Sequence, residues 1–381
     1  MWTRRGAVRF VGGMADTSFE SIDQYPAFLA RLPPSLDLAA LARETKAFLR
    51  PRGIRSPQDL LRLILAWAAG GFSLQRVAAW AGERGIADLT DEALIQRLHR
   101  SAEFVRAVAN AILQSIAQRP SWPGRVLRIA DSSSLSKPAS RGTDWRLHGV
   151  YDLAHGGFSH LELTDGHGGE ALDRGAPVAG EIRISDRGFA NAHAWQRYLN
   201  ASAQHADFIV RMRWNTVRLV DQQGKLFDLI RHLGELPATT QVHEVKLWAQ
   251  SGKHQPAMPI RLVIWRKPPE VTATTQQRLR QHASRQQSKL DDRSLTAAGF
   301  VMLATSLPEA GFPATEILAV YRLRWQIELA FKRLKSLLKI DKIRTRTEAG
   351  TRCWLYGQLT AALLCEDLSR DVLESFPSGA F

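Results

Sequence analysis

Cysteine is scarce in this sequence, and long apolar runs are absent. Of 381 residues only two are cysteine, Cys353 and Cys365, too few for a disulfide framework or a four-ligand zinc site. The longest apolar stretch, residues 60–72, is interrupted by Arg62 and is too short to span a bilayer. Residues 1–13 carry arginines but no sustained apolar segment, so they do not resemble a signal peptide. These absences predict a cytoplasmic protein with no membrane partner.

Acidic residues are also few in comparison with basic ones. Lys plus Arg number 51 and Asp plus Glu number 37, which gives a net charge of +14. The isoelectric point is near 10.3. A basic surplus of this size is typical of proteins that bind polyanions, nucleic acid before membrane, although it also serves solubility. Because 45% of the residues are hydrophobic, the chain has enough apolar material for packed cores.

Three helix-start patterns lie within the first 120 residues. Ser56 followed by Pro57, then Ser73, then Thr90 each stand directly before an amphipathic segment, as helix-capping residues do. Short helices at this spacing predict either a DNA-binding domain of helix-turn-helix type or a plain helical bundle. We assign residues 1–120 to an N-terminal helical domain. DNA binding is its expected role, and the plain bundle is the alternative.

From residue 121 the pattern changes to that of strands. An apolar run at 126–130 leads to Asp131, and a second at 181–185 leads to Asp186. Between them, 146–153 and 158–164 are typical of two further strands, and a helix at 192–203 and a strand at 207–212 follow. Three antiparallel strands, a connection and then strand–helix–strand predict an α/β fold with a ribonuclease-H-like core. Acids that follow such strands lie where open α/β sheets bind ligands.

Residues 321–340 are predicted to form one amphipathic helix. At about 100° per residue, one face carries Tyr321, Arg324, Glu328, Lys332 and Lys335, and leucines occupy the opposite face. Such a helix would pack on a core and present a single carboxylate among cations. Cations suit phosphates and a carboxylate suits a metal ion. The alternative is a solvated face stabilised by ion pairs between successive turns.

Asp131, Asp186 and Glu328 together predict a metal site. Three carboxylates supply oxygen ligands for two Mg²⁺ or Mn²⁺ ions, the arrangement of many nucleases. Each aspartate taken alone is more typical of a turn or a helix cap. A group of histidines offers a weaker alternative, because its irregular spacing fits no zinc pattern: it consists of His148, His155, His160 and His167.

The sequence resembles the DDE transposases of the insertion sequence 4 family over residues 120–345. The spacing from Tyr321 through Arg324 and Glu328 to Lys335 matches the family signature Y-x2-R-x3-E-x6-K. Asp131 resembles the first catalytic aspartate of the family. Asp186, in the setting SDRGF, resembles the second.

The resemblance implies roles for these residues. The three acids would be the catalytic residues and would hold the metal ions. Tyr321, Arg324 and Lys335 would hold phosphates at the ends of the mobile element. Further DNA contacts are expected on position or charge alone from Lys332, Arg211 and Arg213.

The distance from Asp186 to Glu328, 142 residues (328 − 186), is long for one helix and one strand. Segments 241–248 and 260–265 alternate as strands do, and 299–307 is typical of another strand. In the family a mostly β insertion fills this gap. We therefore assign 121–214 and 298–381 to the catalytic core and 215–297 to an insertion domain. The basic segment 276–292 is predicted to be a helix that either follows a DNA backbone or is only exposed.

The resemblance implies cut-and-paste transposition of an insertion sequence. The partners would be double-stranded DNA, namely the terminal inverted repeats and the target, with a dimer formed on DNA in the bacterial nucleoid. Two alternatives remain. One is a catalytically silent, transposase-derived DNA-binding protein, and the other is a ribonuclease-H-like nuclease.

Overall fold

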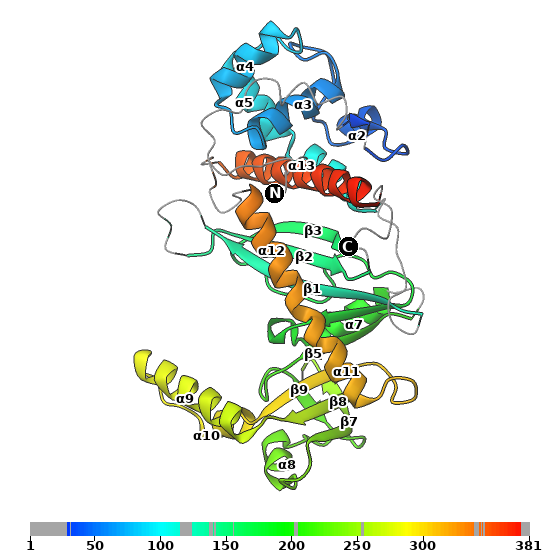
Figure 1. The fold of residues 1–381 in the computed structure, drawn as a ribbon, viewed down its shortest axis with the longest axis vertical. Coiled ribbons are helices and arrows are strands. Elements are labelled where there is room, and N and C mark those ends of the chain that lie inside the picture. The colour runs from blue at the N-terminus through cyan, green and yellow to red at the C-terminus, as the bar shows by residue number, and fades with distance from the viewer. Residues whose placement is uncertain are drawn as a thin grey trace, which may run out of the picture. The chain divides into compact units, whose positions relative to one another are not determined.

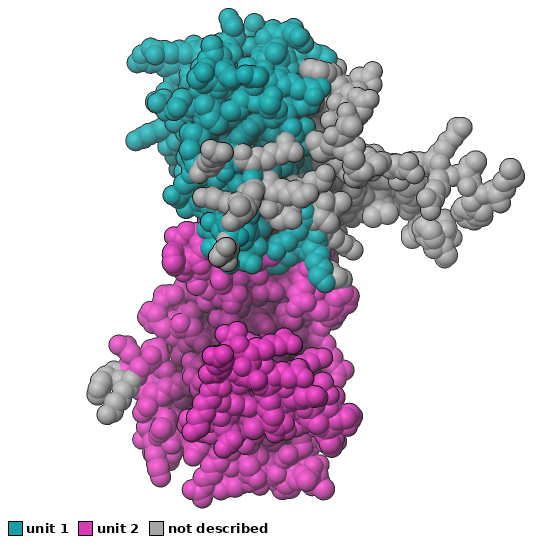
Figure 2. All heavy atoms as spheres, turned by 90° about the vertical axis from the view of Figure 1, so that its left-hand side faces the viewer, with its two compact units in different colours: residues 1–117, 134–145, 331–381 teal, residues 118–133, 146–330 magenta. Residues whose placement is uncertain are grey.

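The chain divides into two compact units, which Figure 2 shows in different colours. Unit 1 comprises residues 1–117, 134–145 and 331–381, and unit 2 comprises 118–133 and 146–330. A computed structural model describes residues 29–374 except 31, 115–123, 137–139, 141, 155, 202–204, 253–254, 339–342, 344 and 346. His155 and the predicted helix end at Ile340 therefore lie outside the described residues.

Unit 1 is helical (Figure 1). Its helices are α2 (Leu38–Glu44), α3 (Pro57–Ala68), α4 (Leu74–Glu83), α5 (Asp91–Arg100), α6 (Ala102–Gln114) and α13 (Glu348–Glu374), together with the part of α12 (Trp325–Leu338) from Phe331 on. Helix α13 packs against α3, α5 and α6, although more than 230 residues separate it from them in sequence (348 − 114 = 234). Trp354 and Tyr356 of α13 are buried in this contact, and Gln358 Nε2 donates to the main-chain oxygen of Ala68 at 2.7 Å.

The three predicted helix starts are confirmed by their caps. The hydroxyl oxygen of Ser56 accepts a hydrogen bond from the backbone N–H of Asp59, at 3.1 Å. Ser73 and Thr90 cap α4 and α5 in the same way, three residues ahead of the donor. Because a cap satisfies N–H groups that the helix itself leaves unpaired, these local patterns could be read directly from the sequence.

Nine strands form one mixed sheet, in the order β3-β2-β1-β4-β5-β9-β8-β7-β6. They are β1 (Val126–Leu135), β2 (Trp145–Asp152), β3 (Gly157–Asp165), β4 (Glu181–Ser185), β5 (Asp207–Arg211), β6 (Arg218–Val220), β7 (Val242–Gln250), β8 (Ala257–Arg266) and β9 (Phe300–Thr305). Strands β1, β4 and β5 are parallel to one another, and β9 runs antiparallel to β5. Residues 215–297 contribute β6, β7 and β8, which continue the sheet through β9. They also form three helices, Leu229–Glu235, Pro269–Arg285 and Asp292–Ala297, so the expectation of a mostly β insertion is wrong. The fold is therefore mixed α/β.

Helix α7 (Ala192–Ala201) covers part of the sheet of unit 2. The Trp195 ring of α7 lies on the Phe208 ring of β5, with centroids 4.9 Å apart, and both side chains are fully buried. Helix α8 (Leu229–Glu235) adds Leu229 and Leu233 to the same apolar core. Helix α9 (Pro269–Arg285) projects from the sheet with α10 (Asp292–Ala297) beside it, and only Ala283 of α9 is buried (Figure 1).

Three predicted boundaries are wrong. The helix predicted over 276–292 begins earlier and ends at Arg285, as α9. Strand β1 does not end before Asp131 but continues to Leu135, whose main-chain oxygen accepts from Asp144 N–H at 3.1 Å. The pairing of the strand thus overrides the low strand preference of three serines. The helix predicted from Tyr321 is also not continuous. Helix α11 (Ala314–Tyr321) is followed by a 3₁₀ turn, η3 (Arg322–Arg324), and then by α12 (Trp325–Leu338).

In the part of the chain that the structure describes, no helix combines the length and apolar character needed to cross a bilayer.

Candidate active site

Parallel pairing of β1 and β4 brings Asp131 and Asp186 to equivalent places. Ala130 and Ser185 are partners in the register, and the two aspartates are the next residue on each chain. Asp131 lies within β1 and Asp186 directly follows β4. Their side chains are 19% and 31% exposed, so solvent and ligands can reach both. The sheet therefore presents two neighbouring carboxylates at one edge.

Tyr321, the last residue of α11, binds the second of these acids. Its hydroxyl donates a hydrogen bond to Asp186 Oδ1 at 3.2 Å, across 135 residues of sequence. Burial raises the pKa of the Tyr321 phenol, and the negative charge of Asp186 raises it further. The phenol therefore stays protonated at neutral pH and acts as a donor.

Arg324, at the end of η3, lies between the other two predicted acids. Its Nη1 is 3.6 Å from Asp131 Oδ2, and its Nη2 is 2.7 Å from Glu328 Oε1. Glu328 is on the first turn of α12, and its side chain is about half exposed. The predicted signature helix thus meets both strand acids within unit 2, through Tyr321 on one and Arg324 on the other.

The carboxyl of Asp131 is in an environment that disfavours its charge. Burial raises its pKa to about 6, and the negative charges of Glu170 and Asp186 contribute to the rise. The backbone N–H of Ser132, which donates to Asp131 Oδ1 at 2.8 Å, and the Arg324 guanidinium oppose it. An added cation would relieve this repulsion, because it stabilises the ionised form.

The remaining predicted DNA contacts differ in their surroundings. Arg211, at the end of β5, has Nη1 3.9 Å from Asp186 Oδ1 and belongs to the same group. Arg213 is exposed in the turn after β5, where its backbone N–H donates to Thr216 Oγ1. Lys332 and Lys335 belong to unit 1. Lys332 is exposed, and Lys335 Nζ donates to the main-chain oxygen of Ser134 at 3.0 Å.

Sequence reasoning missed three residues of this region. Burial lowers the pKa of Lys267, and the nearby charges of Arg211 and Arg187 lower it further, so the three cations are close in space. Glu170, in the loop between β3 and β4, accepts a hydrogen bond from the Ser132 hydroxyl at 2.6 Å. Arg187 directly follows Asp186 and could have been noticed in the sequence. Nothing in the sequence marks Glu170 or Lys267.

Asp131, Asp186 and Glu328 have the ligand atoms that a metal ion needs, but the three carboxylates are not arranged around one point. Carboxylate oxygens are the ligands that Mg²⁺ and Mn²⁺ prefer, and Asp131 and Asp186 are adjacent. Among the described residues, however, no group of three or more acids, histidines or cysteines is arranged to hold a metal. Glu328 is instead paired with Arg324. Two of the three predicted ligands are thus side by side, and the third is engaged by a cation.

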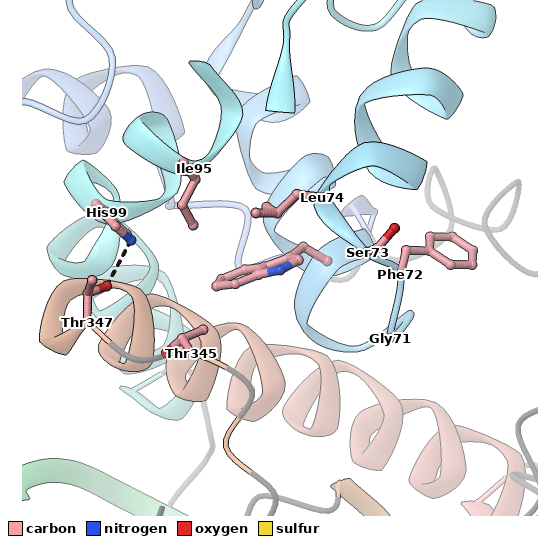
Figure 3. Close-up of a pocket in the computed structure, with 9 residues that line it drawn as sticks. Gly71, Phe72, Ser73, Leu74, Ile95, His99, Thr345 and Thr347 are labelled. Carbon is pink, nitrogen blue, oxygen red and sulfur yellow. Dashed lines mark hydrogen bonds between the residues drawn. The ribbon is translucent and has the colours of Figure 1, made fainter. Parts of the chain in front are cut away.

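A separate pocket of about 510 Å³ lies in unit 1 (Figure 3). It is lined by Trp67, Gly71, Phe72, Ser73, Leu74, Ile95, His99, Thr345 and Thr347. A hydrogen bond of 2.9 Å joins His99 Nε2 to Thr347 Oγ1 at its edge. Because its lining contains no carboxylate, this pocket is distinct from the acid group of unit 2.

Comparison with known proteins identifies the family of the chain. Residues 122–364 match the family model described as Transposase DDE domain. The chain is 37% identical over 367 residues to the transposase for insertion sequence element IS421 of Escherichia coli, covering 94% of this chain and 98% of that one. It is equally similar, over 366 residues and with the same coverage, to the InsL protein for IS186A of Escherichia coli K12. A shorter match, 38% over 96 residues, is to the transposase for IS231F of Bacillus thuringiensis subsp. israelensis, and it covers 24% of this chain and 20% of that one. Since the domain spans more than half of the chain, and it contains all three predicted acids, the protein belongs to the DDE transposase family.

Proposed function

We propose that the protein moves an insertion sequence by cut-and-paste transposition. It would belong to the insertion sequence 4 group, with Tyr321, Arg324, Glu328 and Lys335 as the signature residues. The core would be ribonuclease-H-like, formed by β1 to β5 and α7. The strand order β3-β2-β1-β4-β5, in which the last three are parallel, supports this core.

One observation carries the proposal. Tyr321 and Arg324 reach Asp186 and Asp131 respectively, and Arg324 also holds Glu328. A merely solvated helix face would pair its charges along the helix, as Arg324 and Glu328 do. It would have no reason to contact two acids that stand at equivalent places on neighbouring parallel strands. The long-range contacts therefore favour a shared site over a solvated face.

Asp131, Asp186 and Glu328 would be the ligands of two Mg²⁺ or Mn²⁺ ions. Bound there, the ions would activate the attacking oxygen and stabilise the leaving oxygen. The carboxylates themselves provide the negative charge that selects divalent cations. Arg324, 2.7 Å from Glu328, would compete for it with a metal ion, so its guanidinium would turn to a DNA phosphate when DNA and metal are bound.

The chain's own cations would hold the DNA. Arg324 and Lys335 suit phosphates flanking the scissile bond, and Tyr321 would keep Asp186 oriented through its hydrogen bond. Arg211, Lys267 and Arg187 form a positive group beside Asp186 that suits the continuing backbone. Lys332 and Arg213, both exposed, would add contacts farther along the DNA.

The reaction proposed is hydrolysis followed by strand transfer. A water oxygen attacks the phosphorus at each element end, the P–O3′ bond breaks, and the 3′-oxygen leaves as a hydroxyl. That hydroxyl then attacks a phosphorus of the target, and the target's own 3′-oxygen leaves. The two ends must be brought together, so a dimer on DNA is proposed. Residues 1–120 would serve as a DNA-binding domain and 215–297 as the insertion domain, in the bacterial nucleoid.

The test is cleavage of a supercoiled plasmid that carries the terminal sequences of the element. Purified protein is incubated with Mg²⁺ or with EDTA, beside Asp186→Ala, Glu328→Gln and the control Glu316→Gln, an exposed acid of α11. We expect nicks at the element ends with Mg²⁺ for the wild type and for the control only.

Three other outcomes would change the proposal. DNA binding without cutting, by wild type and variants alike, would indicate a silent DNA-binding protein. Cutting that does not depend on the element ends would indicate a nuclease. Normal cutting by Glu328→Gln would contradict the assignment of the third acid.

A further inference from the structure

Glu170 connects the loop between β3 and β4 to the strand that carries Asp131. Its Oε1 accepts the hydroxyl proton of Ser132 at 2.6 Å and lies 3.6 Å from Arg146 Nη1. Ser132 in turn donates its backbone N–H to Asp131 Oδ1 at 2.8 Å. The carboxylate of Glu170 is thus separated from the first catalytic acid by a single residue.

The other oxygen of Glu170 meets the turn that follows Asp186. A Cβ atom placed on Gly188 would lie 1.5 Å from Glu170 Oε2, and its three nearest atoms would all belong to Glu170. Gly188 is not among the glycines with positive φ, so its backbone conformation is open to other residues. A side chain at position 188 would therefore displace the Glu170 carboxylate from its place against the backbone.

The loop that carries Glu170 is fixed by β4, the strand of the second acid. Arg183, 1% exposed, uses Nη1 to donate to the main-chain oxygens of Leu172, Arg174 and Gly175 at 2.8, 2.8 and 3.0 Å. Buried hydrogen bonds from a charged donor are strong and well oriented. The position of Glu170 therefore follows the position of β4.

We propose that Glu170 is a positioning residue, which holds Ser132 against the Gly188 turn and so keeps Asp131 facing Asp186. The inference rests on the proposed function of those two acids. Glu170 acts through Ser132 on one side and through packing on the other. Because Oε1 accepts from Ser132 and Oε2 lies against Gly188, the arrangement depends on the shape of the side chain and on one acceptor atom.

The test uses two independent ways to remove the contact. Glu170→Ala deletes the carboxylate, whereas Gly188→Ala displaces it by occupying its space. We expect each to slow Mg²⁺-dependent nicking by roughly 10- to 100-fold, as loss of supporting residues around metal ligands does.

The double variant should be no slower than either single one, because the two changes remove the same interaction. Glu170→Gln keeps an oxygen that accepts from Ser132 and should retain most of the rate. Glu316→Ala is the control.

A second readout does not require cutting. Hydrogen exchange of residues 128–133 and 185–190 is compared between wild type, Glu170→Ala and Glu316→Ala. We expect faster exchange in both segments for Glu170→Ala only, because it links the two. Unchanged exchange in Glu170→Ala would overturn the positioning role of Glu170, whether or not the wild type cuts DNA. Absence of cutting by the wild type would refute only the proposed function.

Three further results would count against positioning. Wild-type cutting by Glu170→Ala, with or without altered exchange, would leave the residue a structural role at most. Equal losses in Glu170→Gln and Glu170→Ala would show that charge matters and position does not. Additive losses in the double variant would separate Glu170 from Gly188.

Discussion

Two places on the β1–β4 pair carry charged residues in opposite states. In the buried part Arg128 and Arg183 are register partners, and both bind Glu181, which is fully buried. Glu181 Oε1 accepts from Arg183 Nε at 2.6 Å, and its Oε2 accepts from Arg128 Nη1 at 3.2 Å. Three residues further along each chain, Asp131 and Asp186 are partly exposed, and each lies near one arginine, Arg324 and Arg211 respectively.

This difference separates a structural use of charge from a functional one. A buried charge is tolerated only when it is paired, and removing one partner leaves the others at a large penalty. The Glu181 network meets that condition and fixes the register of the two strands. Beyond it, burial and the neighbouring acids disfavour the charge of Asp131, which a bound cation would stabilise. One strand pair thus provides both the alignment and the two acids proposed as metal ligands.

The largest expected effect concerns Asp131. Asp131→Asn should reduce cutting by roughly 10³-fold or more, as loss of a catalytic group does. It should not lower the midpoint of thermal unfolding, because the neutral amide removes a charge that burial and the neighbouring acids disfavour. Nicking assays and thermal unfolding of the same preparations measure both. If the variant lost stability as well as activity, Asp131 would be a residue that stabilises the fold, as Glu181 is.

For Glu181 we expect a loss of stability instead. Glu181→Ala leaves the buried side chain of Arg183 without its carboxylate and should lower the free energy of unfolding by about 3–5 kcal/mol. Urea unfolding measures this change. The control is Glu235→Ala, which removes an exposed partner of Arg231 on α8 and should leave unfolding nearly unchanged. Equal effects of the two changes would contradict the contrast between the two places on the strand pair.

A smaller effect should follow from His148 on β2, which extends the comparison to the neighbouring strand. Burial lowers its pKa from 6.5 to about 4, and the charges of Arg174 and Arg146 contribute. Between those values the unfolded chain binds the proton more readily than the folded one. Stability should therefore fall as pH drops from 6.5 to 4, by up to about 3 kcal/mol.

Urea unfolding at pH 7 and pH 4.5, for wild type and His148→Gln, tests this expectation. The variant lacks the titrating ring and should lose less stability over that interval. If both lose the same amount, the pH dependence comes from other groups.

The smallest effect on catalysis is expected from α9. No acid lies between Glu270 and Asp291, while Arg278, Arg280 and Arg285 are exposed there. Replacing these three arginines by glutamine should weaken DNA binding. The slope of log affinity against log salt should shrink by about 0.9 for each phosphate that the protein no longer neutralises. Binding titrations at several salt concentrations measure it. An unchanged slope would show that α9 is only an exposed helix.

The sequence predicted features that local chemistry determines. The caps Ser56, Ser73 and Thr90 and the whole of β4 were predicted correctly, because a capping hydroxyl or a short apolar run specifies its own structure. The extension of β1 beyond Asp131 was not, because it depends on pairing with a distant strand. The neighbourhood of Asp131, Asp186, Tyr321 and Arg324 agrees with the predicted face, but their roles stay predictions.

Glu170 and the turn η3 show where sequence patterns fail. Glu170 stands alone in a glycine-rich loop, and its importance arises from contacts with residues 18 and 38 positions away (188 − 170 and 170 − 132). The apolar period of residues 321–338 is the same whether the backbone is α-helical throughout or tightened for one turn. Only the hydrogen bonds reveal the tightened turn.

The turn η3 has a consequence for how this chain can tolerate insertions and deletions. Each residue added or removed between Tyr321 and Glu328 would rotate one signature side chain relative to the other by about 100°. Loops elsewhere can lengthen with little penalty. Variation in length should therefore accumulate outside these eight positions. Inside them, inserting or deleting even one residue would break the contacts of Tyr321 with Asp186 and of Arg324 with Asp131.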